Sequence, residues 1–316
     1  MKKLILSATA CLMLFSCQND QNELTTDATN AVTQRKCATQ DVLEAQLKAD
    51  PTLAIRMNQI EAFTQKALLT KRLVNGKIEI PVVVNVLYRT TSENISAAQI
   101  QSQIDVLNKD YNALNSDYNS VPALFAGVKA NVGITFVLDQ IVRKSTTKTS
   151  WGTNDAMKKT STGGLAPISP TTKLNMWVCT IGGGILGYAQ FPGGASSTDG
   201  VAIDSKYFGL SGSANAPFNL GRTATHEVGH WMNLRHIWGD ATCGSDLVSD
   251  TPTHNDKNFG TPVYPHYSTC AGTPVEMTMN YMDYTDDNAM YMFSAGQKSR
   301  ISAIFVSGGA RASFGI

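Results

Sequence analysis

The segment from His226 to His236 constrains the fold of this chain more than any other. It reads HEVGHWMNLRH, which places His226 and His230 four residues apart, on one face of a helix. On an unbroken helix His236 would lie about 15 Å along the axis from His226, too far away to share a metal ion with it. The helix must therefore end after His230, and the chain must turn back.

The residues inside this segment fit such a turn. Asn233 lies where the turn is expected, and asparagine is the non-glycine residue that most often adopts a left-handed backbone. Three imidazole rings brought together in this way can bind one zinc ion and leave its fourth position open for water. Glu227, next to the first histidine, can take a proton from that water. A set of helical core histidines would explain neither the carboxylate nor the turn, so the sequence predicts a zinc hydrolase.

A second motif, NYMDY, places Met282 46 residues after His236. With the histidine motif and the later string FSAGQ, it resembles the pappalysin (cytophagalysin) family of metzincin zinc metallopeptidases. The resemblance runs from about residue 78 to residue 301. Related zinc proteases carry glycine in the zinc-binding turn, and Asn233 departs from this without touching the ligands. The resemblance implies a metzincin-like α/β (α+β) domain with a twisted, mostly parallel sheet, a backing helix, an active-site helix and a cleft between two lobes.

The family resemblance also implies roles for single residues. Met282 would form the hydrophobic base under the zinc, and Tyr284 would hydrogen-bond the oxyanion of the tetrahedral intermediate. A segment upstream of the zinc helix resembles the edge strand that pairs with an extended peptide substrate through its main chain. Its residues are Gly187, Tyr188 and Ala189. A plain buried strand is the alternative for that segment.

Acidic residues after the third histidine suggest two further features, a pocket for a basic side chain and a calcium site. Family members that prefer Arg or Lys after the scissile bond have an acidic residue shortly after the methionine turn, where this chain has Asp286 and Asp287. Exposed loop carboxylates are the alternative. Family members also bind calcium between the third histidine and this turn, which makes Asp246, Asp250 and Thr251 candidate ligands. Ordinary turn-forming aspartates are the alternative there.

The N-terminal region is typical of an exported bacterial protein. Residues 1–16 predict a signal peptide, with two early lysines and an apolar run too short to span a bilayer. Cys17 ends a string that resembles a bacterial lipobox, and a simple secretory signal is the alternative. We expect residues 17–72 to be a tether and pro-segment, and residues 73–316 to be the catalytic domain. The protein would be secreted or attached to the cell envelope by a lipid.

Cys37 lies in the predicted pro-segment, just before a helical stretch expected over about residues 40–71. A thiolate is a strong zinc ligand, so Cys37 could occupy the open fourth position and keep a precursor latent. Metzincin precursors use such a cysteine switch. An unpaired thiol in the tail is the alternative. Lys71-Arg72 is a candidate activation cleavage point, or else a solvated basic pair.

The remaining cysteines and histidines are assigned more simply. Cys243 and Cys270 flank a loop rich in Gly, Asp and Pro, and outside the cell they are expected to form a disulfide that stabilises by about 3–4 kcal/mol. Relatives have a disulfide in this loop. Cys179 lies in an apolar run and is expected to be a buried free thiol. His254 and His266 are expected at the surface.

Composition and charge limit the expected partners. The net charge is +1 and charged residues make up 16% of the chain, so nothing points to nucleic acid as a partner. Membrane contact would come only through the lipid, and the expected partners are protein or peptide substrates.

Residue patterns predict the order of the main elements. The expected strands are 78–88, 134–141, 174–180 and 201–203, and the expected helices are 96–112, one beginning near 222, and 295–305.

These observations predict a zinc endopeptidase made as a zymogen. The alternative from another class is a catalytically silent surface-binding lipoprotein on the same scaffold. The presence of Glu227 and Tyr284 argues against it. A zinc site with a glutamate as third ligand would have to use Glu276, which does not lie on a predicted helix.

Overall fold

The computed structural model describes residues 32–69 and 78–314. The predicted signal peptide over residues 1–16, the lipid attachment at Cys17 and the cleavage point at Lys71-Arg72 lie outside the described residues, so these stay predictions. Within the described ranges, no helix combines the length and the apolar character needed to cross a bilayer.

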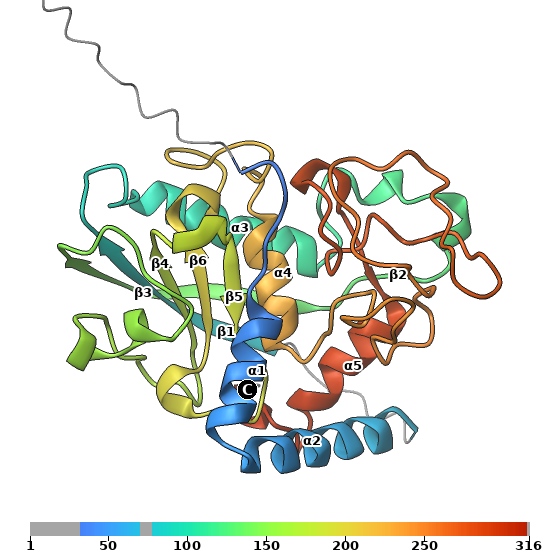
Figure 1. Ribbon diagram of the computed structural model, residues 1–316, viewed down its shortest axis with the longest axis horizontal. Helices are drawn as coiled ribbons and strands as arrows, with labels where there is room; N and C mark the ends of the chain where they lie inside the picture. The colour runs from blue at the N-terminus through green and yellow to red at the C-terminus, as the bar shows by residue number, and fades with distance from the viewer. Residues whose placement is uncertain (1–31, 70–77, 315–316) are drawn as a thin grey trace, which may run out of the picture. The chain divides into compact units, whose positions relative to one another are not determined.

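A five-stranded sheet forms the centre of the described chain, in the order β3-β1-β4-β6-β5 (Figure 1). Neighbouring strands are parallel except for β5, which runs antiparallel beside β6 at one edge. Parallel strands are usually covered on both faces, which explains why β1 and β4 are nearly continuous apolar runs. The mostly parallel sheet expected from the sequence is confirmed. The strands are β1 (Ile78–Tyr88), β3 (Ile134–Ser145), β4 (Leu174–Cys179), β5 (Gly187–Ala189) and β6 (Val201–Asp204).

Side chains of β4 alternate between two core clusters, because successive residues of a strand point to opposite faces. Met176 and Val178 belong to the larger cluster, which also contains Val228 of the zinc-motif helix. Trp177 and Cys179 belong to a smaller cluster on the other face. Cys179 is a buried free cysteine, as predicted.

The helix α3 (Ala97–Tyr111) begins at the predicted place. The Ser96 side chain caps it by accepting a hydrogen bond from the backbone amide three residues on, at 3.0 Å. Its apolar stripe is buried against the sheet. At its last residue, the Tyr111 hydroxyl donates to the Thr225 carbonyl oxygen at 3.0 Å. This bond joins α3 to the helix α4 (Arg222–Trp231), which carries the zinc motif.

The helical stretch predicted over about residues 40–71 forms, as far as residue 69, two helices, α1 (Thr39–Ala49) and α2 (Thr52–Leu69). Pro51 separates them. Because a proline disfavours helical backbone in the residue before it, Asp50 adopts an extended conformation with ψ 91° and ends α1. The predicted helical stretch is confirmed for the described residues, and the break at Pro51 was not predicted.

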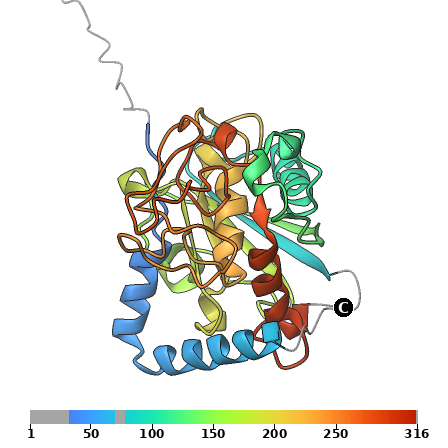
Figure 2. The same cartoon turned by 90° about the vertical axis from the view of Figure 1, so that its right-hand side faces the viewer.

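The C-terminal helix α5 (Ala295–Phe305) has the predicted bounds. Ser294 and Gln297 form a capping box at its start. Figures 1 and 2 show α2 lying against α5. There Glu61 forms an ion pair with Arg300, with 2.5 Å between Oε2 and Nη2. A short antiparallel pair of β2 (Lys129–Ala130) and β7 (Phe293–Ser294) precedes α5.

Candidate active site

Three imidazole rings converge after α4 ends at Trp231. The chain reverses through Asn233, whose φ of 73° is the left-handed turn predicted from the ligand spacing. The turn brings His236 back beside the helix. The Nε2 atom of His230 lies 3.1 Å from that of His226 and 3.0 Å from that of His236.

Each of these histidines bonds a nearby oxygen acceptor through its other ring nitrogen, Nδ1. Carbonyl and carboxylate oxygens only accept hydrogen bonds, so Nδ1 carries the proton and the three Nε2 lone pairs face one another. Lone pairs this close together repel unless a cation lies among them. The acceptors are the Tyr281 carbonyl for His226 at 2.7 Å, the Leu234 carbonyl for His230 at 2.8 Å and the Asp240 carboxylate for His236 at 2.5 Å.

Cys37 belongs to the same cluster. Its Sγ and one nitrogen from each histidine all lie within 4.8 Å of one another. In the described part of the chain, no other group of three or more His, Cys, Asp or Glu side chains is placed to share an ion. Three imidazoles and a thiolate are donors that suit zinc and that magnesium and calcium avoid. The residues therefore fit the zinc ion predicted from the sequence.

Burial sets the charge state of the ligands. It lowers the pKa of His226, and it lowers the pKa of His230 to about 3, with neighbouring histidines acting in the same direction. These two rings are thus neutral, as metal ligands must be. Burial, followed by the Glu227 carboxylate, raises the pKa of the Cys37 thiol, so a thiolate here requires a cation beside it.

Glu227 lies between the histidine cluster and the N-terminal segment around Cys37. Its Oε2 accepts hydrogen bonds from the Thr39 hydroxyl at 2.8 Å and from the Cys37 thiol at 3.3 Å. Burial raises the pKa of Glu227 to about 7. A carboxyl group with this pKa can both accept and return a proton near neutral pH.

The predicted substrate strand is β5, and the N-terminal segment around Ala38 pairs with its free edge. The Ala38 amide donates to the Gly187 carbonyl at 3.0 Å, and the Thr39 hydroxyl accepts from the Ala189 amide at 2.8 Å. A Cβ on Gly187 would lie only 3.0 Å from Glu227 Cγ, so glycine lets the strand lie this close. Tyr188 points to the other core cluster.

Met282 lies directly under α4. A Cβ on Gly229 would lie 2.5 Å from Met282 Sδ, so only glycine in the helix leaves room for this side chain. The Met282 carbonyl also accepts the Ile237 amide at 3.2 Å. These contacts place the methionine below the turn that carries the third histidine, where the sequence resemblance puts it.

Tyr284 reaches the same cluster from the loop after Met282. Its hydroxyl donates to the Cys37 carbonyl at 3.0 Å, and its ring centroid lies 5.0 Å from that of His236. A second aromatic ring was missed by the sequence analysis. Trp238 stacks on His236, with centroids 4.3 Å apart, and its place two residues after a ligand was the only signal.

The structure distinguishes the two acidic residues after the methionine turn. Asp287 is fully buried, and its Oδ1 lies 2.6 Å from Nη2 of Arg35 in the N-terminal segment. The Arg35 guanidinium also donates to the Thr285 carbonyl and the Thr223 hydroxyl, and it lies over the Phe218 ring.

Asp286 forms no hydrogen bond or ion pair with that arginine among the described contacts, and its Oδ1 is buried without a partner. Burial raises the pKa of its carboxyl and the nearby Arg35 charge lowers it, so Asp286 lies beside the pocket without bonding its occupant. Arg35 itself was not singled out as a site residue. Its position two residues before Cys37, together with a predicted acidic pocket, was the available signal.

The candidate calcium ligands divide into two places. Asp246 accepts hydrogen bonds from the Thr251 hydroxyl at 2.9 Å and from the Val248 amide at 3.1 Å. Asp250 instead accepts from the Ser294 hydroxyl at the start of α5, at 2.6 Å. The structure thus brings Asp246 and Thr251 together and uses Asp250 elsewhere.

The loop between the third histidine and the methionine turn contains the predicted disulfide, Cys243–Cys270. His254 in this loop is fully buried, so its prediction as a surface residue is wrong. Its Nε2 accepts the Met277 amide at 2.9 Å, which satisfies a ring nitrogen inside the protein. Glu276 bonds His266 Nδ1 at 3.1 Å and is not part of the zinc cluster.

Solved structures of mirolysin superpose closely on this chain. A point mutant of Tannerella forsythia promirolysin is 38% identical and superposes with a TM-score of 0.81, covering 89% of this chain and 97% of that one. Mature mirolysin from the same organism, in complex with a cleaved peptide, is 42% identical with a TM-score of 0.74, covering 77% of this chain and 97% of that one.

Comparisons by sequence agree. Extracellular metalloprotease 1 of Coccidioides posadasii is 35% identical over 246 residues, which are 73% of this chain and 78% of the relative. An extracellular metalloprotease of Pyricularia oryzae is 32% identical over 287 residues, 86% of this chain and 89% of the relative. Residues 175–305 match the peptidase M43 family model, described as pregnancy-associated plasma protein-A. Similarity of this extent, centred on the histidine cluster, means that the chain belongs to the peptidase M43 (pappalysin) family of zinc metalloproteases.

Proposed function

We propose that this protein is an extracellular zinc endopeptidase made as a latent precursor, with a preference for Arg or Lys after the scissile bond. The observation that carries the proposal is the convergence of three unprotonated ring nitrogens beside Glu227, in a site that the chain's own N-terminal segment covers. His226, His230 and His236 would hold the ion. Zinc bound there would act as a Lewis acid that makes a water molecule acidic near neutral pH.

The chain's own residues would then do the following. Glu227 accepts a proton from the attacking water at Oε2 and returns it to the leaving amine. The Tyr284 hydroxyl, which bonds the Cys37 carbonyl in the structure, would bond the scissile carbonyl oxygen instead. The edge of β5, which now pairs with the pro-segment, would pair with a peptide through the Gly187 and Ala189 backbones. Trp238 would hold the His236 ring by stacking.

We assign latency to the N-terminal segment before residue 73. Cys37 Sγ lies with the three histidines, and Thr39 bonds the proposed base. Both contacts occupy groups that a substrate and a water molecule need. This supports a cysteine switch rather than an unpaired thiol in the tail. Residues 73–316 would be the catalytic domain once this segment is removed.

Basic specificity follows from the pocket at Asp287. In the structure this buried carboxylate binds the guanidinium of Arg35, which is only 1% exposed. A pocket that accepts an arginine of the pro-segment has the size and charge to accept Arg or Lys of a substrate. We therefore assign the specificity to Asp287 and not to Asp286.

Two further parts of the proposal concern location and a second ion. The relatives are named as extracellular, and a disulfide such as Cys243–Cys270 persists in oxidising compartments, so we propose export through the N-terminal signal. Acylation of Cys17 would tether the precursor to the envelope. We also propose calcium at Asp246 and Thr251, because burial raises the pKa of Asp246 to about 6 and a cation would offset this cost.

The direct test replaces the proposed base. Glu227→Ala should retain zinc and fold while its kcat on peptide substrates falls by about 10²–10⁴-fold, the usual contribution of a general base. Glu79→Ala, at an exposed position on β1, is the matched control and should cleave like the parent. Bound zinc is measured by elemental analysis and cleavage by mass spectrometry of a peptide library. Full activity in Glu227→Ala would refute the assignment, and an activated parent that binds peptides without cleaving them would favour the silent binding protein.

A further inference from the structure

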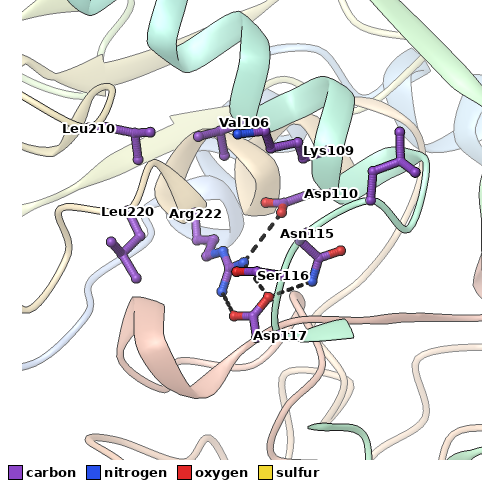
Figure 3. Close-up of a pocket in the computed structure, with 10 residues that line it drawn as sticks. Val106, Lys109, Asp110, Asn115, Ser116, Asp117, Leu210, Leu220 and Arg222 are labelled. Carbon is purple, nitrogen blue, oxygen red and sulfur yellow. Dashed lines mark hydrogen bonds and ion pairs between the residues drawn. The ribbon is translucent and has the colours of Figure 1, made fainter. Parts of the chain in front are cut away.

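The first residue of α4, Arg222, has a side chain that the proposed chemistry does not use. It lies four residues before His226, yet its almost completely buried guanidinium bonds none of the zinc-cluster residues among the described contacts. Figure 3 shows it between Asp110 and Asp117. Asp117 binds it through both oxygens, at 2.7 Å to Nη1 and 2.9 Å to Nη2. A buried arginine with a two-point carboxylate contact is held in a fixed orientation.

Nη1 of the same arginine also holds the loop that carries the specificity residue. It donates to the Asp287 carbonyl oxygen at 2.9 Å and to the Met290 carbonyl oxygen at 2.5 Å. These two carbonyls flank the single 3-10 turn Asp287–Ala289. Arg222 thus bridges α4, the loop at Asp117 and both ends of this turn.

The two oxygens of the Asp287 carboxylate bind different partners. Its Oδ2 accepts hydrogen bonds from the amides of Leu220 and Arg222, at 2.7 and 3.3 Å, which places a negative charge at the N-terminus of α4. Its Oδ1 binds Arg35. These two amides stabilise the buried charge, and only one oxygen remains for a basic side chain. The direction of that oxygen therefore depends on the backbone position of residue 287.

We propose that Arg222 is a positioning residue for specificity: by fixing the backbone of residues 287–290, it aims Asp287 Oδ1 at the basic side chain that follows the scissile bond. The inference rests on the proposed basic pocket. Without the guanidinium, two buried carbonyls lose their donor and the turn relaxes. A shift of about 1 Å is enough to weaken a charge-assisted hydrogen bond substantially.

A pocket of about 250 Å³ borders this arginine, lined also by Val106, Lys109 and Leu220 (Figure 3). It gives a route by which a small cation can reach the place of the guanidinium after truncation. Guanidinium ion is therefore the probe for chemical rescue of Arg222→Ala. A residue that served only the general stability of α4 would not be rescued in specificity by this ion.

The experiment compares two peptides that differ in one residue after the scissile bond, arginine or the uncharged isostere citrulline. In the activated enzyme we expect Arg222→Ala to lower the arginine-to-citrulline ratio of kcat/KM about tenfold, which is a loss of about 1.4 kcal/mol. Cleavage of the citrulline peptide and zinc content should stay unchanged. Guanidinium chloride at about 20 mM, far below denaturing concentrations, should restore part of the ratio. Lys109→Ala, in the same pocket, is the control and should leave the ratio unchanged.

A second variant covers the case in which Arg222→Ala does not fold. Asp117→Asn leaves the arginine in place and keeps Asp110 but removes the closer of its two carboxylate partners, and it should lower the ratio about threefold. An unchanged ratio in the folded variants, or equal losses on both peptides, would overturn the inference. A parent enzyme that does not distinguish arginine from citrulline would instead refute the basic pocket itself, so the two failures can be told apart.

Discussion

Replacing Arg35 by glutamine should loosen the pro-segment while leaving the Cys37 thiol unchanged. In the structure the Arg35 guanidinium is buried and binds Asp287 at 2.6 Å. It also donates to the Thr285 carbonyl at 3.2 Å and to the Thr223 hydroxyl at 3.1 Å. A glutamine side chain is shorter and uncharged. It can form only some of the hydrogen bonds to the Thr285 carbonyl and the Thr223 hydroxyl, and it cannot form the ion pair with Asp287.

The size of the effect follows from burial. Removing one partner of a buried ion pair costs about 3–5 kcal/mol, because the other charge is left without compensation. Here the low end applies, since Asp287 keeps the amides of Leu220 and Arg222. A loss of about 3 kcal/mol raises the population of precursor with a displaced pro-segment about 100-fold.

Thiol reactivity measures this population. In a Glu227→Ala precursor that begins after Cys17, the free cysteines are Cys37 and the buried Cys179. Alkylation of Cys37 by iodoacetamide is followed by mass spectrometry. If the N-terminal segment opens rarely and closes faster than the thiol reacts, the alkylation rate is proportional to the open population, so it should be about 100-fold faster with Arg35→Gln. Lys36→Gln changes an exposed neighbour and should react like the parent. Equal rates for Arg35→Gln and the parent would refute the reasoning, as would the same acceleration in the control.

Two further predictions concern stability. Burial raises the pKa of Asp204 to about 6, so the folded state holds a proton there that the unfolded chain releases near pH 4. The stabilisation from this bound proton is fully present below pH 4 and is lost as the pH rises through 6. Asp204→Asn lacks this pH dependence, so its free energy of unfolding, measured in urea, should rise by about 3 kcal/mol relative to that of the parent between pH 4 and 7. A difference that does not change with pH would contradict the prediction. Calcium at about 1 mM should raise the melting temperature of the parent by about 3 °C and leave that of Asp246→Ala unchanged, and equal shifts in both would exclude this site.

Local signals in the sequence predicted the parts of the fold that depend on local interactions. The helix starts at Ser96 and Ser294 were predictable because a cap is a contact over three residues. The turn at Asn233 was predictable because only a reversal lets the third histidine reach the first two. The edge position of β5 came from family resemblance and not from its three residues.

Contacts between distant residues were not predictable in this way. The Asp287 carboxylate caps α4 from the loop after the methionine turn, far along the chain, and nothing in its neighbourhood marks it as a cap. The pairing of Arg35 with the same residue spans 252 positions. His254 was misplaced for a related reason: a buried histidine needs a partner for its ring nitrogen, and the Met277 amide that supplies one is 23 residues away.

On our proposal, latency and specificity depend on the same residues. Asp287 holds Arg35 in the precursor and, on our proposal, the basic side chain of a substrate in the mature enzyme. Pro-segment and substrate therefore compete for one carboxylate, and a change there that weakens the basic preference must also weaken the hold on Arg35. A variant with a new preference would need a matching change at position 35 to stay latent. This coupling gives a physical reason for a basic residue two positions before Cys37, which the geometry of the zinc ligands alone does not require.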